Sequence, residues 1–211
     1  MIIHFVRHGL SIANEEHLVT GTQSDSLSEE GTRQVSRLSD WLGERISIDD
    51  IFYCSPWMRA QETARLLAQH VEWRLDDRLG ETHAGTVADW MLDEFRQRYP
   101  NFYDSPKNNY PEGESHIDLN NRVISWLEEI ITSDHANKDT GKENTYIVVT
   151  HSGPIACILQ SVLGIQMDQF PALLVGNATV TSLLFSNNVI ECGRLLCLSS
   201  GPDSEICMRT R

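Results

Sequence analysis

Residues 1–11, MIIHFVRHGLS, join a short apolar run directly to three residues that can take part in chemistry. Ile2–Val6 is rich in branched and aromatic side chains, which predicts a buried strand. Arg7, His8 and Gly9 follow without a spacer, so they stand where that strand ends. Residues of these types can bind an anion, ligate a metal ion or simply end a strand, and the rest of the chain is needed to choose.

The overall charge of the chain limits the partners that it can have. Its 211 residues carry 30 acidic and 17 basic side chains, a formal net charge of -13. Nucleic acids and anionic membrane surfaces both select a basic face, so we expect neither as a main partner. A small anionic substrate remains compatible, because a few arginines can form a local positive pocket. No apolar run reaches the roughly 18 residues of a membrane span.

Length and cysteine usage indicate the class of protein. The length predicts one domain over residues 1–211. The first residues lack the pattern of a secretory signal, so we expect none, and the five cysteines form no C-x-x-C pair. We therefore expect reduced thiols and a cytoplasmic protein. The sequence does not indicate the oligomeric state. The cysteines are Cys54, Cys157, Cys192, Cys197 and Cys207.

Strand-like and helix-like segments alternate along the chain. The predicted strands are Ile2–Val6, Ile51–Cys54, Tyr146–Val149 and a closing pair, Thr179–Phe185 and Val189–Leu198. The predicted helices begin at Ser28, at Ser55-Pro56, near residue 87, at a capping box formed by Ser115 and Asp118, and at Gly153-Pro154. The polar stretch Ser133–Asn144 has the composition of a loop. This alternation predicts an α/β fold of three layers, a mostly parallel central sheet with helices on both faces.

Three of the predicted strands end in residues that can carry chemistry. The first ends in Arg7-His8-Gly9, and Ile51–Cys54 runs into Ser55-Pro56 with Arg59 close behind. The third is followed by Thr150-His151-Ser152-Gly153. Ligands of such sheets bind beyond the carboxyl ends of the strands, so we expect these three segments to form one site.

A metal site is disfavoured by the geometry of the first strand. His4 and His8 have the i,i+4 spacing of two zinc ligands on a helix. In a strand, however, residues four apart are separated by more than about 13 Å. We therefore expect His4 to pack beside its strand neighbours.

Two nucleophile motifs are also disfavoured. Thr150-His151-Ser152-Gly153 resembles the nucleophile turn of serine esterases, in which a histidine follows the serine in chain order. All eight histidines precede Ser152, so none can serve in that order. Cys54 and Arg59 resemble a cysteine-phosphatase loop, but their spacing is too short and Pro56 removes a backbone donor.

A phosphate site centred on a histidine fits the remaining residues. Arg7 and Arg59 can each present a planar fork of donors to phosphate oxygens. A neutral His8 is a competent nucleophile, and adjacent arginines should lower its pKa and keep it neutral. His151 could contact the same phosphoryl group and offset its charge. Glu81 could protonate a leaving oxygen, although its local sequence is also that of a surface carboxylate.

The ordered series of motifs resembles the phosphoglycerate mutase-like histidine phosphatases over nearly the whole chain. Arg-His-Gly alone is a weak match, but the series in order is specific. The matching motifs are Arg7-His8-Gly9-x-Ser11-x-x-Asn14, Gly21-x-x-x-Asp25-x-Leu27-Ser28-x-x-Gly31-x-x-Gln34, Ser55-Pro56-x-x-Arg59-Ala60-x-x-Thr63-Ala64, Leu79-x-Glu81-x-x-x-Gly85, Gly113-Glu114-Ser115 with Arg122, and Val148-Val149-Thr150-His151.

The resemblance implies a transient phosphohistidine on His8, with Glu81 as general acid and then base. It places Arg7, Arg59 and His151 around the phosphoryl group, with no metal and no cofactor. The candidate substrate-binding residues that it adds are Ser11, Asn14, Gly21, Thr22 and Ser152, the last standing where many relatives have glycine.

The resemblance leaves the reaction open between three alternatives. Mutases of this family tend to be longer, so the length favours a phosphomonoester phosphatase acting on a small phosphorylated substrate. A cofactor-dependent phosphoglycerate mutase and a non-catalytic phospholigand-binding module remain alternatives. Asp104–Gly113 is the expected lid. The expected outer pocket residues are Leu10, Leu18, Val19, Thr20, His83 and residues 104–112.

Overall fold

A six-stranded mixed sheet in the order β3-β2-β4-β1-β5-β6 forms the centre of the molecule. The computed structural model describes residues 1–136, 143–168, 170–171 and 173–203. The strands are β1 (Ile2–Arg7), β2 (Ile51–Cys54), β3 (Arg74–Leu75), β4 (Thr145–Thr150), β5 (Val180–Leu184) and β6 (Arg194–Ser200). The first four pair in parallel, and β5 and β6 are antiparallel to their neighbours. The predicted fold class is confirmed.

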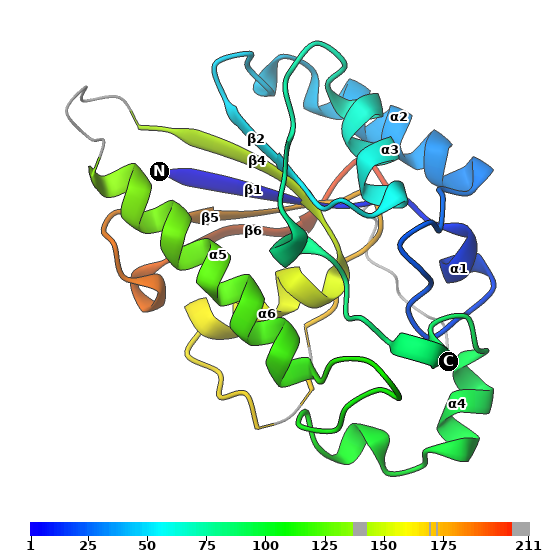
Figure 1. Ribbon diagram of the computed structural model, residues 1–211. Helices are drawn as coiled ribbons and strands as arrows, with labels where there is room; N and C mark the ends of the chain where they lie inside the picture. The colour runs from blue at the N-terminus through cyan, green and yellow to red at the C-terminus, as the bar shows by residue number, and fades with distance from the viewer. Residues whose placement is uncertain (137–142, 169, 172, 204–211) are drawn as a thin grey trace, which may run out of the picture.

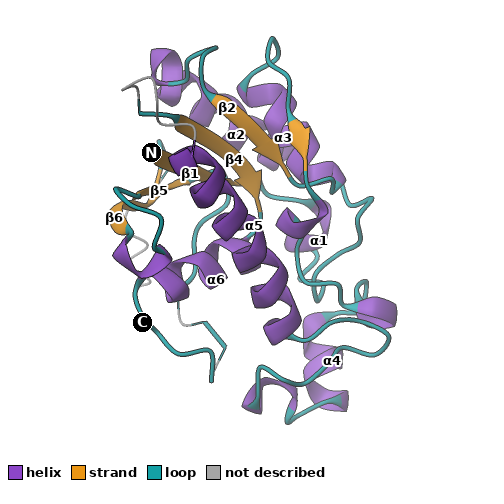
Figure 2. Cartoon of the chain, turned by 60° about the vertical axis from the view of Figure 1, so that its left-hand side comes forward, coloured by secondary structure: helices purple, strands orange, loops and turns teal. Residues whose placement is uncertain are grey.

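Helices cover both faces of this sheet (Figure 1). The helices are α1 (Ile12–Glu15), α2 (Glu29–Leu42), α3 (Met58–Leu67), α4 (Leu92–Arg98), α5 (His116–Ala136) and α6 (Ser152–Val162). Short 3-10 helices lie at Gly43–Arg45, Asp77–Leu79, Gly85–Val87, Phe102–Asp104 and Ile190–Cys192. Figure 2 shows α5 and α6 on one side of the central strands and α2 and α3 on the other.

The alternation of side chains along β4 explains the two covered faces. Tyr146 and Val148 belong to the core beneath α5 and α6, whereas Ile147 and Val149 belong to the core beneath α2 and α3. All four side chains are buried, which accounts for a central strand without a charged residue. A strand buried on both faces holds its carboxyl end in a fixed place, and the site depends on that.

The strand register brings the three reactive segments together. Arg7 pairs with Thr150 across β1 and β4, and Cys54 pairs with Val149 across β2 and β4. The residues that follow the strands are His8 after β1, His151 after β4 and Ser55 after β2. These three residues therefore lie side by side at one edge of the sheet. This outcome is the one expected for parallel strands.

A separate aromatic core lies beyond this edge, around α4. Phe95, Phe102 and Tyr110 are buried in it together with Val87 and Ala84. Figure 1 shows α4 in green, set away from the sheet and near the lower end of α5. This excursion of the chain between β3 and α5 supplies the outer wall of the site.

Two predicted helix starts differ from the structure. Helix α3 begins at Met58 instead of at Ser55-Pro56. The Ser55 hydroxyl instead accepts the Trp57 N–H at 3.2 Å, which makes a turn before the helix. The helix expected near residue 87 begins at Leu92, because the Trp90 carbonyl accepts a bond from Val19 outside any helix.

The ends of two other elements also differ from the prediction. Helix α5 extends through Ser133–Ala136, which were expected in a loop, because Asp134 is buried and accepts bonds from Tyr146 and Asn144. Residues 137–142 of that predicted loop lie outside the described residues. Strand β6 begins at Arg194, after a 3-10 turn that occupies the start of the predicted strand.

Two smaller predictions, the capping box before α5 and the packing of His4, are confirmed. Ser115 and Asp118 form a capping box, in which each side chain accepts the backbone N–H of the other, at 3.1 and 2.9 Å. His4 lies inside β1, and its Nδ1 is 2.7 Å from the Ser182 hydroxyl of β5. The cysteines that the structure describes are free, and Cys207 lies outside the described residues.

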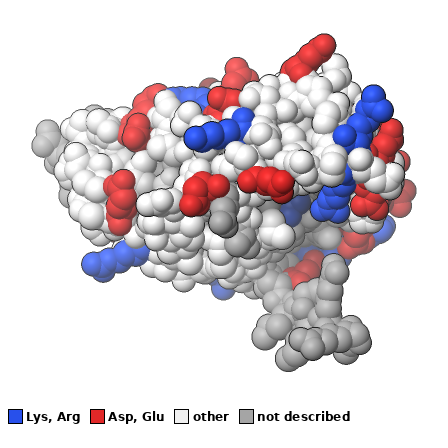
Figure 3. Space-filling model, turned by 90° about the horizontal axis from the view of Figure 1, so that it is seen from below, with Lys and Arg blue, Asp and Glu red and all other residues white. Residues whose placement is uncertain are grey.

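The surface seen in Figure 3 carries both acidic and basic side chains on the visible face. Among the described residues, none of the helices has both the length and the apolar character needed to cross a membrane.

Candidate active site

His8 lies directly after β1 and is held in one tautomer by its two ring partners. Its Nδ1 is 2.6 Å from the Gly9 carbonyl oxygen, which can only accept, so Nδ1 carries the hydrogen. Its Nε2 is 3.1 Å from Nε of Arg59, which can only donate. The lone pair of a neutral imidazole is therefore on Nε2, the atom that faces Arg59.

Burial is the main reason that His8 stays neutral. The side chain is 2% exposed. Its pKa is well below the ordinary value of 6.5, first because of burial and then because of the charges of Arg59 and Arg7. The sequence predicts the effect of the arginines, but the larger cause follows only from the fold.

Arg59 is fixed by the loop that follows α1. Its Nη1 donates to the Thr22 carbonyl at 3.0 Å and to the Asp25 carboxylate at 3.3 Å. Its Nη2 donates to the Thr20 carbonyl at 3.1 Å. A buried guanidinium with this many acceptors cannot rotate, so its Nε remains directed at His8.

Arg7 is less fully bonded than Arg59. Its Nη1 donates to the Val175 carbonyl at 2.5 Å, and its buried Nε has no partner among the described residues. Burial, together with the charge of Arg59, lowers its pKa to about 10 against the opposing effect of Glu81, so it is still charged at neutral pH. A charged, buried and under-bonded guanidinium is suited to receive an anion.

His151 packs edge-on against the His8 ring, with ring centroids 4.9 Å apart. Its Nε2 lies 2.8 Å from the Ser55 hydroxyl, and its buried Nδ1 has no partner among the described residues. Burial, followed by the charge of Arg59, holds the pKa of His151 well below 6.5. The two neutral rings thus form a rigid pair at the edge of the sheet.

Glu81 comes from the loop after β3 and turns towards the N-terminus of α6. Its two carboxylate oxygens accept the Thr82 N–H at 2.9 Å and the Gly153 N–H at 3.2 Å. A Cβ on Gly153 would lie 2.2 Å from Glu81 Oε1, so only glycine leaves room for the carboxylate. The local sequence did not distinguish this position from a surface carboxylate, because its partner is 72 residues away.

Arg122 of α5 holds the backbone that carries Glu81. Its Nη2 donates to the Glu81 carbonyl at 2.8 Å, and its Nη1 donates to the Gly80 carbonyl at 2.9 Å. Glu114 pairs with the same guanidinium at 2.6 Å. Arg122 therefore positions the loop without facing the His8 ring itself.

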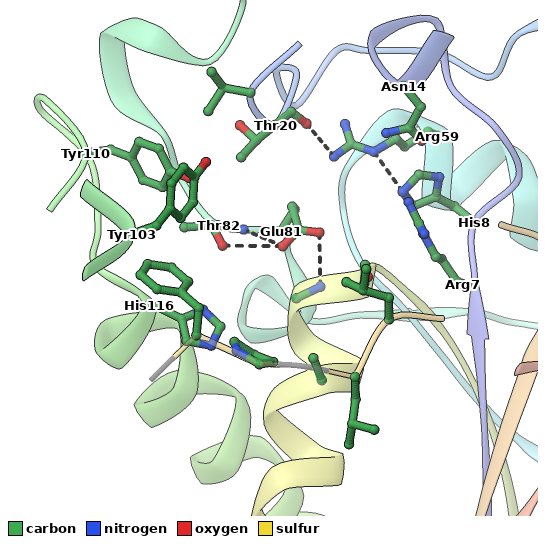
Figure 4. A pocket seen from close by; sticks show the side chains of 18 of the residues that line it. Arg7, His8, Asn14, Thr20, Arg59, Glu81, Thr82, Tyr103, Tyr110 and His116 are labelled. Atoms are coloured by element: carbon green, nitrogen blue, oxygen red, sulfur yellow. Dashed lines mark hydrogen bonds between the residues drawn. The ribbon is translucent and has the colours of Figure 1, made fainter. Parts of the chain in front are cut away.

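A cavity of about 490 Å³ opens in front of these groups (Figure 4). Of the predicted site residues, it is lined by Arg7, His8, Asn14, Arg59, Glu81 and Ser152. His151 lies behind the His8 ring, and Ser11 is buried and accepts the Asn14 N–H as the cap of α1. Gly21 and Thr22 line a neighbouring hollow of about 300 Å³ with Trp57 and His83.

The residues that line the outer part of the cavity agree only in part with the predicted ones. Val19, Thr20 and Tyr110 line it, as expected, whereas Leu10, Leu18 and His83 are not among its lining residues. The lining residues that the sequence did not indicate are Thr82, Arg96, Tyr103, His116, Gly153, Ala156, Phe170, Pro171, Leu173 and Leu174.

Asn177 was also missed. Its Nδ2 lies 3.2 Å from the His8 carbonyl and 3.2 Å from Asn14 Oδ1, so it ties the turn after β1 to α1. With Oδ1 of Asn14 engaged in this way, the amide nitrogen of Asn14 is the donor left for the cavity. Asn177 is 163 residues from Asn14 and carries no motif, so no local pattern could have found it.

Comparisons with known proteins show which family of proteins the chain resembles. Residues 3–196 match the sequence model of the histidine phosphatase superfamily (branch 1). Phosphoserine phosphatase 1 of Hydrogenobacter thermophilus is 28% identical over 82% of this chain and 82% of that protein. Glucosyl-3-phosphoglycerate phosphatase of Mycolicibacterium vanbaalenii is 26% identical over 84% of this chain and 81% of that protein.

A solved structure shows the same fold. Alpha-ribazole phosphatase from Shigella flexneri superposes with a TM-score of 0.80 over 95% of this chain and 96% of that chain. The two sequences are 21% identical, so the likeness concerns the architecture alone.

Proposed function

Because the chain belongs to the histidine phosphatase superfamily, branch 1, we propose that it hydrolyses phosphomonoesters through a covalent phosphohistidine on His8. The observation that carries this proposal is the tautomer of the buried His8 ring. A buried imidazole with its hydrogen on Nδ1 presents the Nε2 lone pair beside two arginines, at the wall of the cavity. A neutral ring nitrogen in that position is a nucleophile for an electrophilic phosphorus.

In the first step His8 Nε2 attacks phosphorus while the ester P–O bond breaks. Arg59 exchanges its bond to Nε2 for one to a phosphoryl oxygen, and Arg7 offers its unpaired donors to the same group. The leaving oxygen takes a proton from Glu81, which lies between His8 and Tyr110 (Figure 4). The alcohol then departs and the phosphoryl group remains on nitrogen.

In the second step a water oxygen attacks the phosphorus of the phosphohistidine. Glu81, now a carboxylate, takes a proton from that water, and the P–N bond breaks with its electron pair returning to Nε2. Inorganic phosphate leaves and the neutral imidazole is restored. Neither step needs a metal ion, because the arginines supply the positive charge.

The test is a trap of the intermediate. The wild-type protein is mixed with a ³²P-labelled phosphomonoester and quenched, and we expect label that is stable to base and labile to acid. His8→Ala should carry no such label. His17→Ala, at an exposed position outside the cavity, is the matched control and should be labelled like the wild type.

Two outcomes would contradict the proposal. Binding of phosphate without any labelling would indicate a non-catalytic phospholigand-binding module. Interconversion of 2- and 3-phosphoglycerate without release of inorganic phosphate would indicate a mutase.

A further inference from the structure

The outer half of the cavity has a wall of four aromatic rings, which we name the aromatic wall: Tyr103, Tyr110, His116 and Phe170. Phe170 lies 5.2 Å from the rings of both Tyr103 and His116, measured between centroids. Figure 4 shows Tyr103, Tyr110 and His116 on the side opposite His8 and Arg7, with Glu81 between the two sides. A leaving group attached to a phosphate at His8 must therefore extend past Glu81 towards this wall.

Two titratable groups of the wall are uncharged at neutral pH. Burial, together with the neighbouring Tyr103 phenol, raises the pKa of Tyr110, so its phenol keeps its proton. Nε2 of His116 lies 3.7 Å from the Cys157 thiol, and burial lowers the pKa of His116, so it is uncharged at neutral pH. The wall thus presents ring surface and uncharged polar atoms to the cavity.

The hydroxyls of the two threonines beside the wall have partners within the protein. The Thr20 hydroxyl donates to the Gly21 carbonyl at 3.0 Å, and the Thr82 hydroxyl lies 3.4 Å from the Glu81 carboxylate. Their hydrogens are therefore committed to the protein, and a polar leaving group gains few new donors from them.

Positive charge is concentrated at the inner end. Among the described residues that line the cavity, the cations are Arg7, Arg59 and Arg96. The first two surround His8, where the phosphoryl group needs them. Arg96 stands at the rim with its side chain 57% exposed, and it lies 3.5 Å from Asp93. Arg96 is therefore the described lining cation that a second anionic group in the outer half could approach, and it is already paired with Asp93 at the rim.

We propose that this outer half is a subsite for an aromatic ring, so that the preferred substrates are phosphomonoesters of alcohols that carry a ring and no second acidic group. The inference rests on the proposed function of the same site. It also separates this chain from the phosphoserine and glucosyl-3-phosphoglycerate phosphatases to which it is similar, whose named substrates are strongly polar.

The test compares esters whose alcohols have similar acidity, so that leaving-group reactivity does not decide the result. We expect kcat/KM for 2-phenylethyl phosphate to exceed that for ethyl phosphate by roughly tenfold to a hundredfold, the gain from burying a phenyl group. O-Phospho-L-serine and 3-phosphoglycerate should fall with ethyl phosphate or below it. A higher kcat/KM for either of them than for 2-phenylethyl phosphate would overturn the inference.

Two variants locate the effect. Phe170→Ala removes a ring of the wall and should reduce the ratio of kcat/KM for 2-phenylethyl over ethyl phosphate by about tenfold. Tyr99→Ala removes a ring that packs on Phe95 in the same aromatic core but does not line the cavity, so it should leave that ratio unchanged. Equal effects of the two variants would mean that the wall acts only through stability.

A binding measurement separates this inference from the proposed function. Calorimetry with 2-phenylethylphosphonate and ethylphosphonate needs no catalysis, and we expect the first to bind at least about tenfold more tightly. Equal affinities would overturn the aromatic subsite even if His8 is labelled. Absence of turnover and of label, with unequal affinities, would overturn the phosphatase and leave the subsite standing.

Discussion

At the scale of single residues, the site depends on atoms that restrict one another. The tautomer of His8 follows from an acceptor on one side of the ring and a donor on the other. Gly153 leaves room for the Glu81 carboxylate, which occupies the space that a Cβ at this position would fill. Such positions allow sharp tests, since a change of one carbon atom alters one proposed catalytic group.

Gly153→Ala tests the placement of Glu81. The new Cβ would force the carboxylate away from the leaving oxygen, so we expect kcat/KM for an alkyl phosphate to fall roughly a hundredfold, within the range of general acid catalysis. The p-nitrophenolate of p-nitrophenyl phosphate leaves without a proton, so kcat/KM for that ester should fall much less. Glu81→Gln should reproduce this selectivity. Equal losses on both esters would show that the substitution damages more than proton transfer.

At the scale of elements, the ends of strands and helices deliver the reactive groups. β1, β2 and β4 end together and place His8, Ser55 and His151 side by side. Helix α5 begins at the cavity with His116 and carries Arg122 two turns later, where it holds the Glu81 loop. The start of α5 is therefore a structural requirement for both ends of the cavity.

Ser115→Ala tests the capping box of α5. The substitution removes the acceptor for the Asp118 N–H, and we expect the free energy of unfolding to fall by about 1 kcal/mol. Urea denaturation followed by circular dichroism measures the change. Ser36→Ala is the matched control, because that exposed hydroxyl in the middle of α2 bonds only the Thr32 carbonyl. A loss no larger than that of the control would show that the box contributes nothing.

At the scale of the whole molecule, an acidic protein surrounds a cationic site with neutral histidines. The net charge is -13, yet the inner cavity is lined by Arg7 and Arg59. His8 and His151 are buried and uncharged beside them. Unfolding releases these histidines to water, where they can bind protons, so stability is linked to pH.

The sign of this linkage follows from the lowered pKa values of His8 and His151. Below pH 6.5 the unfolded chain binds protons at these residues and the folded chain does not, so stability falls as the pH falls. Each histidine contributes up to about 1.4 kcal/mol per pH unit until the folded pKa is reached. Above pH 6.5 the two histidines are neutral in both states, so they no longer make the stability depend on pH.

Urea denaturation at pH 8, 7, 6 and 5 in phosphate-free buffer measures the effect. His8→Asn should lose stability less steeply than the wild type between pH 6.5 and 5, because it lacks one of the buried titrating groups. His70→Asn, at an exposed position, is the control and should follow the wild-type slope. A His8→Asn profile parallel to that of the wild type would show that the His8 ring is protonated in the folded protein.

Much of the fold could be predicted because it depends on local sequence patterns. The apolar runs of β1 and β4 and the capping box at Ser115 depend on neighbouring residues alone. The start of α3 could not be predicted from local patterns, because Ser55 has a second partner in His151, far along the chain. The same holds for the end of α5, where Tyr146 draws Asp134 into the core.

The sequence by itself determined the α/β class and the set of reactive residues at three strand ends, because strand periodicity and motif order are local properties. Only the tertiary structure decided what each group can do. The tautomer of His8, the carboxylate of Glu81 beside Gly153 and the support from Asn177 all depend on contacts between segments far apart in the chain. The aromatic wall likewise combines Tyr103 with Phe170, two segments that meet only after folding. Reactivity arises from those contacts, since burial and bonding partners set the charge and direction of a side chain.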